Sequence, residues 1–221
     1  MNILVIAAHP DDEVLGMGAT IQKLNKENHK IHLCVVSEGA TAQYKDSKMI
    51  EIRKKSCIKS GTLLGISTFD FLEFPDMKLD SIPHLEINMK LEKIIQKYKP
   101  QVVYTTPLND LNKDHQIVFE STLVVTRPQS SSVKEVLSYE LPGITQTPFF
   151  PNVYVDVTKE ISQKIKAFKM YDTEIEKFPH PRSITAIENL SIQRGIESGL
   201  ENAEAFTLIK KIYSKKDKFY S

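Results

Sequence analysis

Short apolar runs alternate with segments of helical periodicity through the first half of the chain. The runs predict strands at Ile3–Ala8, His29–Ser37, Phe69–Phe74 and Gln101–Thr105. Between them, apolar residues recur every three or four positions and predict helices over Val14–Asn28, Asp46–Gly65 and Leu85–Tyr98. Strands joined through helices of this length pair in parallel with right-handed crossovers. We therefore expect an α/β domain with a mainly parallel sheet flanked by helices.

The second half of the chain continues with shorter elements and shows no linker, so residues 1–221 are expected to form a single domain. The expected elements are a polar loop at Pro107–His115, a helix over Gln116–Thr126, strands at Val133–Leu141 and Val153–Val157, a helix capped by Thr158 and running to Tyr171, and a helix from Ser183 toward Glu197. The spacing further predicts a last helix over Ala203–Tyr213 and a solvated end at Lys215–Lys218.

Composition narrows the class of protein. Lys and Arg number 29 against 28 Asp and Glu, and this balance gives no reason to expect a nucleic-acid partner. No apolar run approaches the ~20 residues of a membrane helix, and no secretory signal is recognised at the N-terminus. Cys34 and Cys57 lie in apolar segments and are expected as core thiols rather than a disulfide. These features favour a cytoplasmic protein without a membrane span.

A turn rich in carboxylates, His9-Pro10-Asp11-Asp12-Glu13, joins the first expected strand to the first helix. Catalytic and ligand-binding groups of open α/β sheets gather at this end of the strands. Pro10 biases His9 toward an extended conformation, which limits the direction of its imidazole. The carboxylates would repel one another unless a divalent cation or the N–H groups of the helix N-terminus compensated their charge. The alternative is a solvated acidic turn that caps the helix.

A second polar loop, Asp110 to His115, follows the fourth strand and opens the next helix. Loops at the strand ends of one parallel sheet can converge on the same crevice. His9, Asp12 and His115 together would offer two imidazoles and one carboxylate, a set that suits catalytic Zn²⁺ and also non-haem Fe²⁺. Such a metal lowers the pKa of its water toward ~7, and Asp11 is placed to accept the proton as a general base. Asp114 can orient an imidazole by accepting a hydrogen bond from the ring nitrogen that does not bind the metal.

Two motifs carry a resemblance to a known family. They are Ala8-His9-Pro10-Asp11-Asp12-Glu13 after the first strand and Asp110-Leu111-Asn112-Lys113-Asp114-His115 after the fourth. Together they resemble the PIG-L/LmbE-type zinc-dependent N-deacetylases. Weaker agreement continues through Phe149–Val153, Pro179–Ser183, Arg194-Gly195 and Ala203–Phe206. The resemblance implies a Rossmann-like fold, one Zn²⁺ held by His9, Asp12 and His115, Asp11 as the base, and removal of an N-acyl group, usually acetyl, from an amino sugar.

The group that protonates the leaving amine stays open. Some members of the family carry a histidine three residues before the last metal histidine, where this chain has Asn112, which can bind substrate but cannot deliver a proton. Arg53 is a candidate substrate-binding cation, and a solvated helix arginine is its alternative. His180, held between two prolines, is the candidate second catalytic donor, with an exposed loop histidine as the alternative. Protonated Asp11 is the rival donor.

Three functions follow from these residues. The first is a hydrolase that removes an N-acetyl group from an N-acetylglucosamine-type glycan, glycoconjugate or nucleotide sugar. The second is a metal-dependent amidase acting on a non-sugar amine or thiol conjugate. The third is a sugar-binding protein without turnover, against which Asp11 argues, because binding alone needs no base beside a metal. The aglycone and the oligomeric state stay open, and a homo-oligomer is compatible with the sequence.

Overall fold

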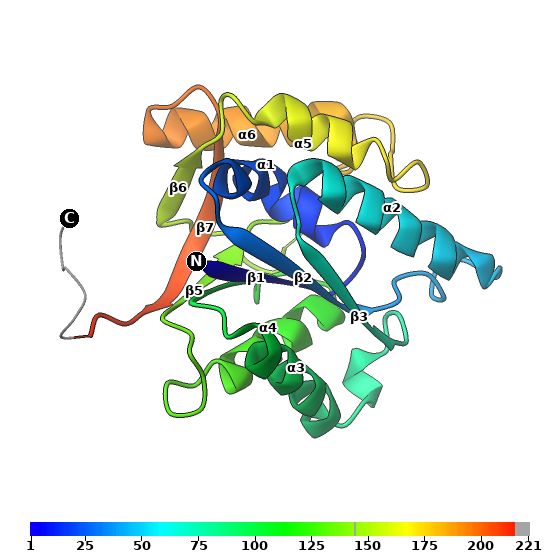
Figure 1. Cartoon of the computed structure of the whole chain (residues 1–221). Helices are drawn as coiled ribbons and strands as arrows, with labels where there is room; N and C mark the ends of the chain where they lie inside the picture. Colours follow the sequence, from blue (N-terminus) through cyan, green and yellow to red (C-terminus); the bar gives the residue numbers. More distant parts are fainter. Residues whose placement is uncertain (144, 215–221) are drawn as a thin grey trace.

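A seven-stranded sheet of order β3-β2-β1-β4-β5-β7-β6 runs through the molecule (Figure 1). The computed structural model describes residues 1–143 and 145–214. In chain order the strands are β1 (Asn2–Ala7), β2 (Lys30–Ser37), β3 (Thr68–Phe74), β4 (Val102–Thr105), β5 (Glu135–Tyr139), β6 (Val153–Asp156) and β7 (Ala203–Lys211). Strands β1 to β5 pair in parallel, whereas β7 runs antiparallel to both β5 and β6. The expected α/β fold with a mainly parallel sheet is therefore confirmed.

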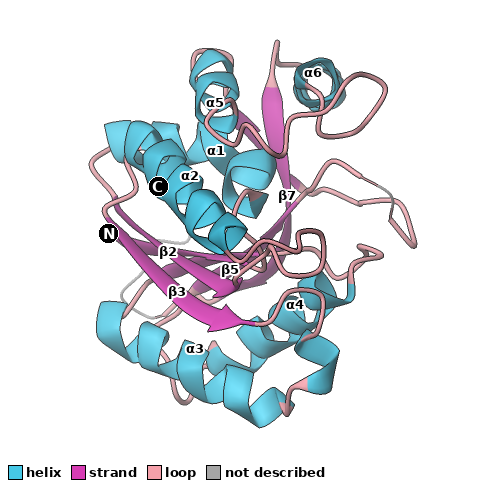
Figure 2. Ribbon diagram, turned by 90° about the vertical axis from the view of Figure 1, so that its right-hand side faces the viewer, coloured by secondary structure: helices cyan, strands magenta, loops and turns pink. Residues whose placement is uncertain are grey.

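Helices cover both faces of this sheet, as the view turned by 90° shows (Figure 2). They are α1 (Asp12–Lys26), α2 (Lys48–Leu64), α3 (His84–Tyr98), α4 (Lys113–Val125), α5 (Ile161–Phe168) and α6 (Ile184–Ser198), with a short 3₁₀ turn, η1 (Leu79–Ser81). Apolar residues of α1, α2, α5 and α6 pack on one face, and those of α3 and α4 pack on the other. The sheet is thus the middle of three layers.

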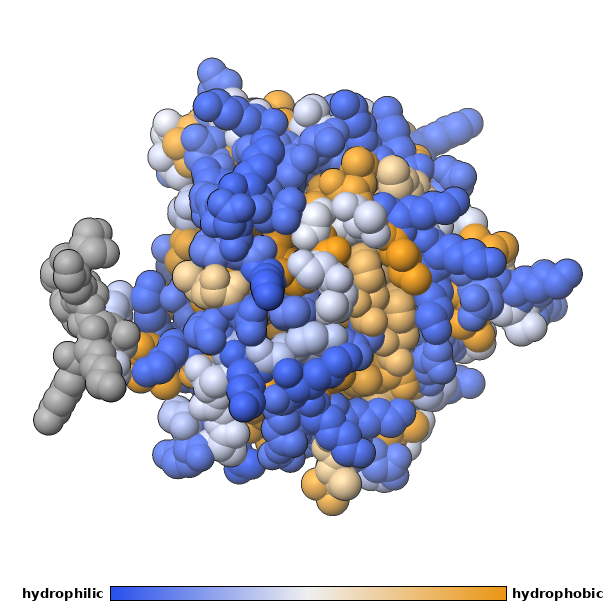
Figure 3. Space-filling model, in the orientation of Figure 1, coloured by the Kyte–Doolittle hydropathy of each residue, from blue (hydrophilic) through white to orange (hydrophobic). Residues whose placement is uncertain are grey.

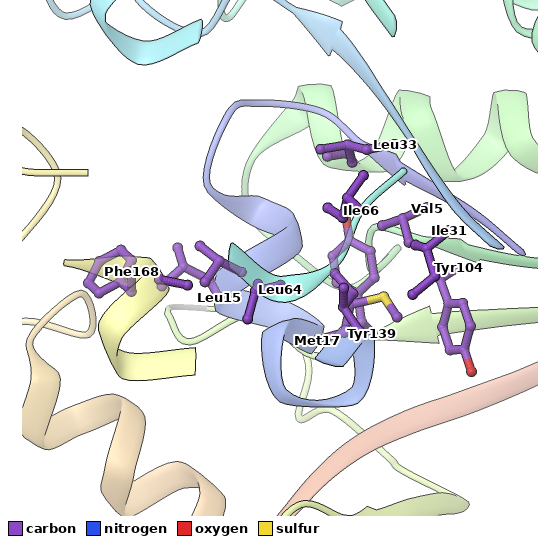
Figure 4. Packing of buried hydrophobic residues seen from close by; sticks show 14 of the residues in the cluster. Val5, Leu15, Met17, Ile31, Leu33, Leu64, Ile66, Tyr104, Tyr139 and Phe168 are labelled. Carbon is purple, nitrogen blue, oxygen red and sulfur yellow. The ribbon is translucent and has the colours of Figure 1, made fainter. Parts of the chain in front are cut away.

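The alternating side chains of β1 show why an apolar run forms a central strand here. Ile3, Val5 and Ala7 point into the core beneath α1, whereas Leu4 and Ile6 point into the core beneath α3 and α4. Burial on both faces explains the continuous hydrophobic run, because a strand covered on two sides has no solvent-facing position. Figure 4 shows part of the first core, where aliphatic side chains surround the ring of Tyr139.

The last expected helix, Ala203–Tyr213, is wrong, because this segment forms strand β7. β7 lies between β5 and β6 and pairs with both. The ring of Phe206 in β7 is fully buried in the core on the α1 side of the sheet. Sheet pairing on both sides overrides the helical spacing of its apolar residues. The expected cap is also wrong, since the helix begins after Glu160 rather than Thr158. The expected solvated end at Lys215–Lys218 lies outside the described residues.

Most of the surface seen in Figure 3 is hydrophilic, and a narrower hydrophobic strip lies near the edge strand β3. In the part of the chain that the structure describes, no helix combines the length and apolar character needed to cross a membrane. Cys34 and Cys57 are buried free thiols, which confirms the prediction of core thiols.

Helix α1 is broken at Met17, whose φ of −149° is not helical. The break frees backbone N–H groups in the middle of a buried element, and those of Ala19 and Thr20 donate to the carboxylate of Glu204 at 3.1 and 2.6 Å. Lys164 balances this buried charge by donating to Glu204 Oε1 at 2.7 Å. The pair therefore caps the second half of α1 from strand β7 and helix α5, which keeps the helix that follows the carboxylate turn in place.

Replacing Lys164 with Ala should lower the free energy of unfolding by about 3–5 kcal/mol, because the carboxylate of Glu204 would stay buried without an opposite charge. Urea unfolding measures this loss. Lys166→Ala in the same helix is the matched control, and its exposed side chain predicts a change within ~0.5 kcal/mol. A loss for Lys164→Ala as small as that of the control would contradict the capping role.

Candidate functional site

The two polar loops meet where the chain connections diverge from the sheet. β1 and β4 are neighbours, with Val5 opposite Tyr104, but β1 leads into α1 on one face and β4 into α4 on the other. Ligand-binding groups of open α/β sheets gather at such a divergence, at the carboxyl ends of the strands. His9 and Asp12 come from the first loop and the start of α1, and His115 comes from the first turn of α4. The expected convergence of the two loops therefore occurs.

His9, Asp12 and His115 form one buried cluster whose ligand atoms lie within 4.8 Å of one another. His9 Nδ1 lies 3.1 Å from His115 Nε2, and His115 Nε2 lies 3.4 Å from Asp12 Oδ1. The other oxygen of Asp12 accepts hydrogen bonds from the backbone N–H groups of Ala8 and His9 at 3.0 and 2.8 Å. One oxygen thus holds the turn, while the other faces the imidazoles.

Carboxylates back both imidazoles on the side away from the cluster. Asp114 Oδ2 lies 3.2 Å from His9 Nε2, as expected for a residue that orients the ring. Asp110 Oδ2 lies 2.9 Å from His115 Nδ1, and Asp76 Oδ1 lies 3.4 Å from His9 Nε2. Neither Asp110 nor Asp76 was assigned a role from the sequence. Both follow strands of the sheet, so the rule that located the first two loops could have found them.

His9, Asp76 and Asp114 form a second group of possible metal ligands. Asp114 is already engaged, however, because its two oxygens accept the backbone N–H groups of Met77 and Leu79 at 2.9 and 3.1 Å. A carboxylate held in this way is suited to fix the proton on His9 Nε2, which leaves Nδ1 directed at His115. The group of His9, Asp12 and His115 is therefore the better metal site.

The carboxylates around His9 and His115 favour a positive charge in the cluster. Burial lowers the pKa of both imidazoles, but hydrogen bonds with Asp114 and Asp12 outweigh it at His9 and raise its pKa to about 9. At His115 the charge of Asp12 and the hydrogen bond with Asp110 raise the pKa to about 10. Although burial raises the pKa of Asp12, His115 holds it well below its usual range. Two imidazole nitrogens and one carboxylate in this setting are a donor set that Zn²⁺ takes.

Asp11 is buried beside this cluster in an unusual backbone conformation. Its φ is +122°, a backbone conformation that residues other than glycine rarely adopt. Holding a residue in this conformation costs roughly 1–3 kcal/mol. Neither carboxylate oxygen receives a hydrogen bond from any residue that the structure describes. Although Asp11 occupies the N-cap position of α1, its side chain makes no capping hydrogen bond. The alternative of a solvated helix cap therefore does not describe this turn.

Two arginines compensate the charge of Asp11. Arg53 and Arg182 each place Nη2 3.4 Å from Asp11 Oδ2. Arg53 is 2% exposed, so it is not the solvated helix arginine of the alternative. Arg182 comes from the segment between the two prolines and α6, and no role of its own was expected for it from the sequence. Both arginines also face the buried carboxylate of Glu174.

The structure does not bring His180 into this group. His180 is exposed, its Nδ1 accepts the backbone N–H of Arg182 at 3.1 Å, and its own N–H donates to Lys177. These contacts lie within its own loop, and a catalytic role for His180 stays a prediction. Asn112 is half-buried at the N-cap of α4, where its Oδ1 accepts the N–H of Asp114 at 2.9 Å. It helps to hold the turn that carries His115.

Comparison with known proteins identifies the family. The model of the PIG-L family, described as GlcNAc-PI de-N-acetylase, matches residues 4–126, and the chain belongs to this family. A relative in Escherichia coli K12, named uncharacterized deacetylase YaiS, is 30% identical over 179 residues, which cover 77% of this chain and 90% of that protein.

Two solved structures share the fold. The N,N'-diacetylchitobiose deacetylase of Pyrococcus horikoshii is 24% identical, with a TM-score of 0.77 over 95% of this chain and 84% of that one. GalB of Pseudomonas putida, a 4-carboxy-2-hydroxymuconate hydratase, is 16% identical, with a TM-score of 0.80 over 98% of this chain and 99% of that one. One fold thus supports more than one reaction, so the function has to be inferred from the site.

The buried carboxyl group of Glu13 predicts a pH dependence of stability. Burial raises the pKa of Glu13 from 4.5 to about 8, against the hydrogen bond that Tyr171 donates to it. The native state then holds its proton more tightly than the unfolded state. Stability is full below pH 4.5, falls as the pH rises toward 8, and falls no further above it.

In Glu13→Gln this loss of stability should disappear. Between pH 5 and 8 the free energy of unfolding of wild type should therefore fall relative to that of the variant. Urea unfolding at pH 5, 6.5 and 8 measures the difference with equal metal loading of both proteins. Parallel pH profiles of the two proteins would show that Glu13 keeps an ordinary pKa.

Proposed function

We propose that this chain is a metal-dependent hydrolase that removes an N-acetyl group from an amino-sugar substrate of the N-acetylglucosamine type. The observation that carries the proposal is the meeting of His9, Asp12 and His115 next to the buried carboxylate of Asp11, which accepts no hydrogen bond from the described residues. Three ligands and an adjacent base are the parts that amide hydrolysis by an activated water requires.

His9, Asp12 and His115 would hold Zn²⁺, with Fe²⁺ as the second possibility for this ligand set. When bound, such an ion supplies a Lewis acid that makes water a nucleophile near neutral pH. Asp11 takes the proton of the attacking water and returns it to the amine as the amine leaves. The arginines keep Asp11 fixed during this transfer, while Asp114 and Asp110 hold the imidazoles of His9 and His115 in the orientation in which they would bind the metal.

The amino-sugar part of the proposal is supported by the relatives. The family description names a GlcNAc-PI de-N-acetylase, and the P. horikoshii protein is named as a deacetylase of diacetylchitobiose. We infer that this chain likewise accepts a free, lipid-linked or nucleotide-linked N-acetylglucosamine. The amidase acting on a non-sugar conjugate and the sugar-binding protein without turnover are the competing functions.

An acetate-release screen distinguishes these functions. The Zn²⁺-loaded protein is incubated with free, lipid-linked and nucleotide-linked N-acetylglucosamine, with N,N'-diacetylchitobiose, and with N-acetylated amines that lack a sugar. Chelator-treated protein is the control. Acetate release from at least one sugar is expected, and it should vanish on metal removal. Release from the non-sugar amides alone would favour the amidase, and binding without release would favour the third function.

Metal content tests the ligand set. His9→Ala and His115→Ala should each lose the tightly bound metal, whereas wild type should hold one ion per chain. Elemental analysis after dialysis gives the ratio of metal to protein. His84→Ala is a matched control, because this exposed histidine lies at the start of α3 and contacts Ser121. Full occupancy in both ligand variants would exclude the assignment.

Asp11→Asn should fold and keep its metal but release acetate about 10²–10⁴ times more slowly, the usual contribution of a general base. The measurements are steady-state kinetics together with metal content and an unfolding curve. Turnover within a few-fold of wild type would remove Asp11 from the mechanism. A variant that loses metal along with activity would instead make Asp11 part of the metal site.

A further inference from the structure

Asp11, Arg53, Glu174 and Arg182 form a closed ring of alternating charge. Both arginines approach Asp11 Oδ2 at 3.4 Å. On the other side, Arg53 Nε lies 3.3 Å from Glu174 Oε1, and Arg182 Nη1 donates to Glu174 Oε2 at 2.7 Å. Two positive and two negative groups balance each other, which makes the burial of these charges tolerable. The two arginines nevertheless differ in what else they contact.

Arg53 is enclosed by the protein itself. Its Nη1 donates to the carbonyl of Gly39, and its Nη2 donates to the carbonyl of Pro10 at 2.8 Å. These carbonyls belong to the loops that follow β2 and β1, and the side chain is only 2% exposed. Gly39 is required at this point, because its φ is +63° and a Cβ there would lie 2.5 Å from Pro10 Cδ. Arg53 therefore fastens two loops around Asp11 and has no open side for a substrate.

Arg182, by contrast, is partly exposed to solvent. Its side chain is 28% exposed, although its guanidinium faces the same oxygen of Asp11. Glu174, which is 2% exposed, fixes the orientation of this guanidinium and is itself held by hydrogen bonds from Thr173 Oγ1 at 2.9 Å and from the Tyr44 hydroxyl at 3.3 Å. A planar guanidinium held at one edge keeps its remaining donors in a fixed direction.

His180 supports the loop that presents Arg182. Its ring accepts the N–H of Arg182, and its carbonyl accepts the N–H of Ser183 at 2.9 Å, where α6 begins. The imidazole is thus turned back on its own backbone. The residue of the Pro179–Arg182 segment that reaches Asp11 is the arginine.

We propose that Arg182 contacts the substrate by donating to the amide carbonyl oxygen beside Asp11, and that Glu174 and His180 are its positioning residues. The proposal rests on the proposed function. As water attacks, a C–O bond forms at the carbonyl carbon and the water proton passes to Asp11. The C–N bond then breaks, and Asp11 returns the proton to nitrogen. Arg182 neither gains nor loses a proton, and it stabilises the negative charge that builds on the carbonyl oxygen.

Kinetics of acetate release test this role. Arg182→Gln should lower kcat by about 10²–10³, the usual cost of removing one donor to the oxyanion, with unchanged metal content. Guanidinium ion at low concentration should restore part of the activity of Arg182→Ala, which a purely structural role would not produce. His180→Ala should lose about tenfold or less, because the effect passes through the loop. Arg127→Gln is the matched control at an exposed arginine outside the ring.

The proposal would be overturned, and His180 would be the donor, if three results came together. His180→Ala would lose as much kcat as Arg182→Gln and would keep its metal. Guanidinium ion would not restore the activity of Arg182→Ala.

Labelling of the wild-type protein tests the exposure of Arg182 without a variant. Phenylglyoxal modification followed by peptide mapping should mark Arg182 and spare Arg53, and the sugar that releases acetate should protect Arg182. Modification of Arg53 with Arg182 untouched would overturn the proposal. If wild type releases acetate from no compound, the proposed function fails, and the labelling pattern still decides which arginine is open.

Discussion

Burial of the Asp11 carboxylate is the constraint on which the site depends. This carboxylate lies away from water and accepts no hydrogen bond within residues 1–143 and 145–214, so its charge requires the two nearby arginines, and each arginine needs its own partner in turn. Glu174 meets that need from a loop in the last third of the chain. The local strain at Asp11, with φ at +122°, persists because these contacts hold the turn from several sides. Loops after β1 and β2, helix α2 and the segment before α6 are thus connected through one carboxylate.

The sequence predicted the parts of the fold and site that local pattern determines. The apolar runs indicated β1 to β4, and the position of the polar loops at the strand ends predicted that His9, Asp12 and His115 meet. Apolar spacing failed for β7, because pairing with β5 and β6 is a property of the assembled sheet. The sequence predicts no role for Glu174 or Arg182, since the charges that they meet at Asp11 and Arg53 are distant in sequence.

The family and its fold do not by themselves define the reaction. A hydratase and a sugar deacetylase both superpose closely on this chain, so the shared sheet is a scaffold whose loops decide the chemistry. In this chain the relevant loops bring together a possible metal group, a strained carboxylate and a partly exposed arginine. The buried ion pair of Lys164 and Glu204 serves the scaffold instead, because it caps the helix that breaks at Met17.

The order of the ring residues along the chain has a consequence for biosynthesis. His9, Asp12 and His115 all lie within the first 115 residues, whereas Glu174 and Arg182 leave the ribosome much later. A nascent chain would therefore carry a full ligand set while Asp11 still lacks one of its two arginine partners. Synthesis of the candidate ligand set and completion of the charged ring around Asp11 would then be separate events in time, with the C-terminal third of the chain providing the second.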